Sequence, residues 1–350
     1  MPACLTLKKP LLIVAVIFFL LPATGLASTD PLPAIYKLRP DLQSVFDSDT
    51  GLATSPKAGF LVDLEDWAHQ YGWQEYPEEL ASYAPATNPP VAGKTPAPTI
   101  TARDYIVVDA SSGVILSARG ADEVWPVASL TKLMTAQVAL DRGLHLSEVV
   151  AVTNADNVGG ARLYVDDGTT FSASDLLSAM LIGSANNAAN ALARAAGPNF
   201  VSAMNARASS LNLSHTHFID ASGIEPQNVS TAREVALFAN EAFTHSEVQQ
   251  RTTTVKKQIY AITTDEWRDL KTTNWMLYYP EYDDVYVTAG KTGYLEESGW
   301  NVVERLRPSA NGKNQELLIV TFGSASRGDS FHDAEALAEW IWQSYTFASE

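Results

Sequence analysis

DVYVTAGKTGY, GWNVVERL and ELLIVTFGS, at residues 284–294, 299–306 and 316–324, decide the fold. Each is a short apolar run of the length and composition that predict a β-strand. Ser298-Gly299 and Asn311-Gly312 mark the turns between them. Because parallel neighbours would need long crossovers, these short connections predict an antiparallel sheet.

Another pair of apolar runs lies far upstream, DYIVVDA at 104–110 and GVILSA at 113–118. The residues between them, Ser111-Ser112-Gly113, are typical of a hairpin. We expect this hairpin to complete the sheet, giving about five strands.

The chain between the hairpin and the last three strands is mainly helical. A helix is predicted to follow Pro126 and to run to about Leu140, with Gly143 as its C-terminal cap. Its residues are apolar or small on most sides, which indicates a helix surrounded by protein. Two further helices have capping patterns at their starts: Ser172-Ala-Ser-Asp175 and Thr231-Ala-Arg-Glu234. A last helix is predicted from the apolar residues of one face: Ala334, Leu337, Ala338, Ile341 and Tyr345.

The order of these elements predicts an α+β fold. An antiparallel five-stranded sheet carries terminal helices on one face, and an all-helical subdomain lies beyond it. A Pro- and Ala-rich segment at 84–99 is typical of an extended linker. We therefore expect an N-terminal extension and linker over residues 28–100 and one folded domain over residues 101–350.

The first 27 residues have the pattern of a secretory signal peptide. Lys8 and Lys9 form its charged start, an apolar run follows, and Ala27 ends a small-residue cleavage site. A retained membrane anchor is the alternative, which the shortness of the apolar run disfavours. After cleavage we expect no integral membrane span and a protein outside the cytoplasm. The one cysteine, Cys4, would be removed with the signal.

Charge and histidine placement exclude several partners. The chain carries 24 Lys+Arg against 40 Asp+Glu, a net charge of -16, which disfavours nucleic acid and anionic lipid. His215 and His217 alternate as two metal ligands on a strand would, but no third ligand lies at a usual spacing. We expect neither a metal nor another cofactor.

ASLTKLMTA, at 128–136, combines a hydroxyl with an amine on one helix face. Ser129 and Lys132 are three residues apart, so their side chains can meet. A serine becomes a nucleophile when a base takes its proton, and burial would lower the pKa of Lys132 enough for that role. A capping serine with a solvated lysine is the alternative, but Lys132 has apolar neighbours, and none of the other lysines follows a serine at this spacing.

Two more short motifs add polar groups. SAN at 184–186 lies between two helical segments, where a loop can present the Ser184 hydroxyl and the Asn186 amide. KTG at 291–293 ends an apolar strand and supplies a positive charge, a hydroxyl and a glycine that lets a substrate backbone approach. The order Ser-x-x-Lys, Ser-x-Asn, Lys-Thr-Gly is far more specific than any one of them.

With these motifs the sequence resembles the serine penicillin-recognising enzymes, and within them the low-molecular-mass penicillin-binding proteins of the D-alanyl-D-alanine carboxypeptidase A family. The likeness covers about residues 100–345 and includes GGARLYVDDGTTFSASDLLSAMLIGSANNAANALA, THFIDASGI and GSASRGDSFHDAEAL. It implies a β-lactamase/DD-peptidase-like fold. It also implies peptidoglycan stem peptides as substrates, β-lactams as covalent inhibitors, and a periplasmic or cell-wall location.

The resemblance also implies a role for each motif residue. Ser129 would be the acyl-enzyme nucleophile and Lys132 its proton acceptor, with Ser184 helping to pass the proton and Asn186 holding the substrate amide. The remaining implied positions lie on the KTG strand: Lys291 and Thr292 for the terminal carboxylate, Gly293 for close approach, and the backbone N–H of Tyr294, with that of Ser129, for the oxyanion.

Asn187 lies close to the motifs in the sequence, and Arg327 is a candidate to lie close to them in the fold. Most relatives have an aspartate after the second motif, where this chain has Asn187, a change expected to matter little. Arg327, before the last helix, is expected either near the carboxylate site or in a surface ion pair.

Three alternatives to a carboxypeptidase stay open. A DD-endopeptidase that cleaves cross-links uses the same motifs, and the chain ends soon after the predicted domain, which is typical of compact endopeptidases. A β-lactamase of class A would need an added glutamate, for which no loop motif is found. A cell-wall binding protein with an inactive site is the non-enzymatic alternative.

Overall fold

The computed structural model describes residues 91–92, 95–312 and 315–347. The predicted signal peptide and most of the predicted extension lie outside the described residues. The predicted linker ends inside them, where β1 (Val91–Ala92) pairs with β13 (Tyr345–Thr346). Thr95 then accepts a hydrogen bond from the Trp340 indole at 2.8 Å. The end of the linker is therefore part of the folded domain.

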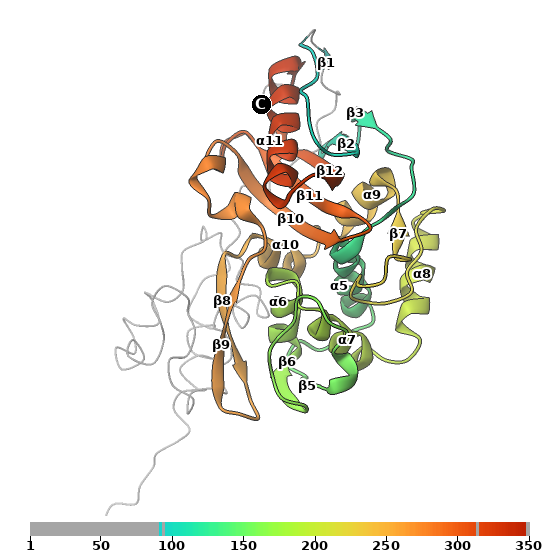
Figure 1. The fold of residues 1–350 in the computed structure, drawn as a ribbon, viewed down its shortest axis with the longest axis vertical. Coiled ribbons are helices and arrows are strands. Elements are labelled where there is room, and N and C mark those ends of the chain that lie inside the picture. The colour runs from blue at the N-terminus through green and yellow to red at the C-terminus, as the bar shows by residue number, and fades with distance from the viewer. Residues whose placement is uncertain (1–90, 93–94, 313–314, 348–350) are drawn as a thin grey trace, which may run out of the picture.

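A five-stranded antiparallel sheet in the order β10-β11-β12-β2-β3 forms the centre (Figure 1). In that order the strands are Tyr286–Leu295, Gly299–Arg307, Leu317–Ser324, Asp104–Asp109 and Ile115–Arg119. The predicted strands and the hairpin that completes the sheet are confirmed. β10 lies at one edge of the sheet, beside the helices (Figure 1).

Alternation along the strands divides the core between the two faces of the sheet. On β12, Leu317 and Ile319 point to the face covered by α11 (Arg327–Ser344), whereas Leu318 and Val320 point to the helical block. α11 buries the predicted residues Ala334, Leu337, Ala338 and Ile341. Tyr345 was predicted on this helix, but it lies in β13, because pairing with β1 ends the helix at Ser344.

The helical block consists of six helices in the described part of the chain. They are α5 (Thr131–Asp141), α6 (Ala173–Ile182), α7 (Asn186–Ala195), α8 (Phe200–Ser210), α9 (Ala232–Ala242) and α10 (Ser246–Thr253). The predicted caps hold: the Ser172 hydroxyl accepts from the Asp175 N–H, and that of Thr231 accepts from the Glu234 N–H. Four short strand pairs surround the block or flank the sheet, β1 with β13, β4 (Trp125–Pro126) with β7 (Val229–Ser230), β5 (Val149–Val152) with β6 (Thr169–Ser172) and β8 (Lys256–Ala261) with β9 (Glu266–Lys271).

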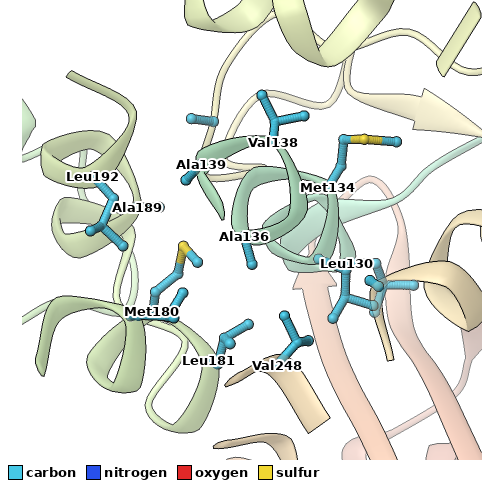
Figure 2. Packing of buried hydrophobic residues seen from close by; sticks show 14 of the residues in the cluster. Leu130, Met134, Ala136, Val138, Ala139, Met180, Leu181, Ala189, Leu192 and Val248 are labelled. Atoms are coloured by element: carbon cyan, nitrogen blue, oxygen red, sulfur yellow. The ribbon is translucent and has the colours of Figure 1, made fainter. Parts of the chain in front are cut away.

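Helix α5 runs through the middle of this block, and its residues from Thr131 to Ala139 are all buried. Figure 2 shows Ala136 of α5 pointing toward Met180 and Leu181 of α6 and Val248 of α10, with Ala189 and Leu192 of α7 on the same side of the helix. The prediction of a surrounded helix is confirmed. Pro126 precedes the helix as predicted: it pairs in β4, the turn η3 (Ala128–Leu130) follows, and the α-helix begins at Thr131. Across the described residues no helix is long and apolar enough to span a membrane.

Candidate active site

Ser129 lies in the short turn η3 (Ala128–Leu130), directly ahead of α5. Ala128 has a positive φ of 50°, a backbone conformation that residues with a side chain seldom adopt. Gly223 packs on the same turn so closely that a Cβ there would lie 2.0 Å from the Ala128 carbonyl oxygen. Packing against Gly223 therefore fixes the backbone that presents the partly buried Ser129 hydroxyl.

Lys132 follows on the first turn of α5 and is fully buried. Its Nζ donates to Ser129 Oγ at 2.8 Å, to Asn186 Oδ1 at 2.7 Å and to the Ser222 carbonyl at 2.5 Å. These bonds use all three donors of an ammonium group. In a neutral amine the bonds to Asn186 and Ser222 can remain, and the lone pair then faces the Ser129 hydroxyl. The predicted meeting of Ser129 and Lys132 is confirmed.

The surroundings of Lys132 favour its neutral form. Burial lowers the pKa of Lys132 well below its usual value, the charge of Lys291 lowers it further, and Asp220 opposes both effects. A lysine in this position can accept a proton at a pH where an exposed lysine is fully charged.

The SAN motif joins the other two motifs. Ser184 lies between α6 and α7, as predicted, with a positive φ of 59°. Its hydroxyl accepts a hydrogen bond from Lys291 Nζ at 3.0 Å; among the described hydrogen bonds it makes none to Lys132. Asn186 accepts from Lys132 and donates to the Gly159 carbonyl at 2.9 Å. Hydrogen bonds thus connect all three motifs in one site.

The KTG motif lies within β10, with Leu295 as the last residue of the strand, so it does not mark the strand end. Lys291 Nζ also donates to the Thr292 carbonyl at 2.8 Å. Burial lowers the pKa of Lys291 to about 7, with Glu304 opposing and Arg327 adding to the effect. The site therefore holds two buried lysines whose charges repel each other.

Gly293 lets β10 approach the Ser129 turn. A Cβ on Gly293 would lie 3.0 Å from the Val127 carbonyl oxygen and 3.2 Å from the Ser129 backbone nitrogen. The segment that comes close to Gly293 in the structure is therefore the Ser129 turn, and its approach places the Ser129 N–H beside β10. Tyr294, the next residue, exposes 48% of its surface and contacts Trp300, with ring centroids 4.3 Å apart and ring planes tilted by 30°.

Asn187 has a structural environment that the sequence did not reveal. It is fully buried, accepts from the Leu163 N–H at 2.9 Å and donates to the Leu163 carbonyl at 2.9 Å and to Asn157 Oδ1 at 3.0 Å. It therefore ties α7 to the loop that also contacts Asn186 through Gly159.

Arg327 lies beside the KTG strand. Its Nη2 donates to the Thr273 carbonyl at 2.6 Å, and Thr273 Oγ1 lies 2.7 Å from Thr292 Oγ1. Of the two predicted alternatives, the structure supports a position near Thr292, since Arg327 forms no ion pair within the described residues. Sequence reasoning missed Thr273, which has no signal of its own.

Glu304 on β11 is the other group that the motifs did not reveal. It is fully buried opposite Gly290, and both of its carboxyl oxygens accept from Asn274 Nδ2 at 3.0 Å. Burial raises the pKa of Glu304 well above its usual value, while the Asn274 bond and Lys291 lower it. A charged residue inside the apolar run GWNVVERL was the one sequence signal for it.

The fold and the site define a class of proteins, the penicillin-binding proteins and DD-peptidases. Penicillin-binding protein D2 of Listeria monocytogenes in its cefotaxime-bound form is similar with a TM-score of 0.61 and 29% identity, covering 71% of this chain and 100% of that chain. Residues 91–326 match the D-alanyl-D-alanine carboxypeptidase family, peptidase S11, and the chain belongs to that family.

Two relatives show how far the likeness extends. A D-alanyl-D-alanine endopeptidase of Pseudomonas aeruginosa is 31% identical over 75% of this chain and 84% of its own length. Another protein of that name, from Haemophilus influenzae, is 32% identical over 58% of this chain and 69% of its own length. The predicted family and fold class are confirmed.

Proposed function

We propose that the protein is a serine-type D-Ala-D-Ala carboxypeptidase that acts on peptidoglycan stem peptides through an acyl-enzyme on Ser129. The observation that carries this proposal is the 2.8 Å contact between Ser129 Oγ and a fully buried lysine whose pKa is lowered. A hydroxyl paired with such an amine is an activated nucleophile.

In the first step Ser129 Oγ attacks the carbonyl carbon between the two D-alanines and its proton passes to Lys132 Nζ. The oxygen of the tetrahedral intermediate is negatively charged and needs donors placed in advance. The backbone N–H groups of Ser129 and Tyr294 are proposed for this role, which the close approach at Gly293 supports.

In the second step the C–N bond breaks and the leaving nitrogen takes a proton. Ser184 is proposed to deliver it, since its hydroxyl is hydrogen-bonded to a second buried lysine, Lys291. Lys132 is proposed to pass the proton gained from Ser129 on to the Ser184 oxygen, so both residues return to their starting protonation states and the protons balance over acylation. Water afterwards hydrolyses the ester, and Ser129 recovers its hydrogen.

The carboxylate of the last D-alanine is proposed to lie against Lys291, Thr292 and Arg327. The ammonium of Lys291 and the hydroxyl of Thr292 can both donate to a carboxylate. The Arg327 guanidinium lies nearby, since it donates to the carbonyl of Thr273, whose hydroxyl contacts that of Thr292. Asn186, held by Lys132 and Gly159, is proposed to bind the substrate amide. β-Lactams that resemble this terminus are proposed to acylate Ser129 and to leave slowly.

A DD-endopeptidase is the second candidate function. The relatives from P. aeruginosa and H. influenzae carry that name. The chemistry would be unchanged, because the attacked carbonyl again belongs to D-alanine and the leaving nitrogen belongs to a second peptide. We further propose that residues 1–27 direct export, so that the enzyme meets its substrate in the periplasm or at the cell wall.

Product analysis tests both candidates. The purified protein is incubated with a pentapeptide ending in D-Ala-D-Ala and, separately, with a cross-linked peptide dimer. Free D-alanine from the first supports the carboxypeptidase, and separated monomers from the second support the endopeptidase. If the folded wild-type protein forms neither product, the proposed function is rejected.

The pH dependence follows from the two lysines. On the acid side kcat/KM is expected to rise with pH as Lys132 loses its proton and becomes a base. It is expected to fall as pH rises through about 7, where Lys291 loses the charge that binds the substrate carboxylate. A peptide whose terminal carboxyl is an amide serves as control. With this peptide kcat/KM is expected not to fall above a pH of about 7. If kcat/KM fell equally for both peptides in this range, the assignment of Lys291 to the carboxylate would be contradicted.

A further inference from the structure

A row of aromatic rings and a cation leads away from the KTG strand. Arg327 Cζ lies 5.8 Å from the ring centroid of Trp300 and 4.8 Å from that of Trp275. Trp275 contacts Tyr279 edge-on with centroids 5.2 Å apart, and Tyr279 lies 4.6 Å from Tyr278. We call these five residues the aromatic row.

The aromatic row starts at the proposed carboxylate site and ends at another cation. At its start, Arg327 donates to the Thr273 carbonyl, and the Thr273 hydroxyl contacts that of Thr292. At its end, Lys271 Nζ lies 4.3 Å from the ring centroid of Tyr278. Three rings, those of Trp275, Tyr279 and Tyr278, therefore lie between two positive charges.

Neither cation has an acidic partner within the described residues. Arg327 makes one hydrogen bond, to a backbone carbonyl, and its buried Nε has no partner there. Lys271 is exposed at the end of β9. Acidic side chains outnumber basic ones 40 to 24 in this chain, so two cations without carboxylates on one row indicate an anionic ligand.

A D-alanine leaving group does not need this row, because it consists of a carboxylate and one methyl group beside the amine. A cross-linked peptide joined through a diamino diacid is different. Its leaving amine sits on a carbon that carries a carboxylate and also an aliphatic chain, which continues into a second peptide with further carboxylates. This leaving group matches a row that begins at a carboxylate site and continues over rings to a cation.

We propose that the aromatic row binds the leaving peptide of a cross-linked substrate. The aliphatic chain of the diamino diacid lies on the rings of Trp275 and Tyr279, and a carboxylate of the second peptide lies near Lys271. The inference rests on the proposed function, since it requires Ser129 to form the acyl-enzyme. It adds a binding site for the leaving peptide of the second candidate function, on residues that the three motifs do not include.

Kinetics with two substrates test the inference, using Tyr279→Ala and Lys271→Gln. Both variants are expected to lower kcat/KM for the dimer about tenfold, with that for the D-Ala-D-Ala pentapeptide and the rate of β-lactam acylation changed less than about twofold. Tyr286→Ala is the matched control, because Tyr286 lies on β10 outside the row and exposes 43% of its surface, against 38% for Tyr279.

The outcomes separate the inference from the proposed function. Equal losses for dimer and pentapeptide, or no loss for the dimer beyond that of Tyr286→Ala, would overturn the assignment of the row. A wild-type enzyme that releases D-alanine but leaves the dimer intact would also overturn it, while the carboxypeptidase proposal would stand. Absence of β-lactam acylation and of both products in the wild type would overturn the proposed function itself.

Discussion

Replacing Lys132 with alanine is expected to slow acylation of the protein by a β-lactam about 10²- to 10⁴-fold, the usual contribution of a general base. The Lys132 amine is the only basic group that hydrogen-bonds Ser129 Oγ in the described residues, at 2.8 Å. Without it the Ser129 proton has no acceptor as the ester bond forms. The rate of adduct formation, followed by intact mass, measures the effect.

Two controls accompany the Lys132 variant. Lys256→Ala removes an exposed lysine on β8 and is expected to leave the acylation rate within about twofold. Lys132→Arg keeps a charge that cannot be lost near neutral pH, so it should acylate as slowly as Lys132→Ala. If Lys132→Arg kept more than a tenth of the wild-type rate, proton transfer to this residue would be disproved.

Gly223→Ala is expected to lower both stability and the acylation rate. Gly223 has a φ of +78°, and an added Cβ would lie 2.0 Å from the Ala128 carbonyl oxygen and 2.8 Å from Thr131 Oγ1. The strained φ costs about 1–2 kcal/mol and the overlap about 1–3 kcal/mol more. Since the overlap displaces the backbone next to Ser129, acylation should slow as well. Denaturant unfolding at unchanged m-value measures the first effect.

Gly143→Ala is the matched control for Gly223→Ala. Gly143 has nearly the same φ, +76°, but an added Cβ would meet no atom within 4 Å. Gly143→Ala should therefore be destabilised only by the strained φ, and it should acylate at the wild-type rate. Equal losses of stability and activity in the two variants would contradict the claim that packing at Gly223 holds the Ser129 turn.

Local patterns predicted much of the fold correctly. The strand runs, the Ser111-Ser112-Gly113 hairpin and the caps at Ser172 and Thr231 all depend on neighbouring residues, and each formed where the sequence placed it. Elements that depend on distant partners were missed. Trp125–Pro126 forms a strand because it pairs with Val229–Ser230 about a hundred residues later, which no local pattern shows.

The residues of the candidate site also divide into those that belong to a local sequence motif and those that matter only through contacts with distant residues. The three motifs were found because each has a spacing of its own, and the structure brings them together through bonds of Lys132 and Lys291. Glu304 and Thr273 were not found, since what matters for them is register and contact: Glu304 lies opposite Gly290, and Thr273 touches Thr292. A single sequence contains no signal for such pairings.

The most direct test of the account is the intact mass of the protein after incubation with a β-lactam, in wild type and in Ser129→Ala. One adduct is expected per wild-type molecule, located on the peptide that contains Ser129, and none on the variant. The variant should unfold at the same denaturant concentration as the wild type, because a methyl group replaces a partly buried hydroxyl without new overlap. An adduct that persists in Ser129→Ala, or a wild type that forms none, would contradict the assignment of Ser129 as the nucleophile.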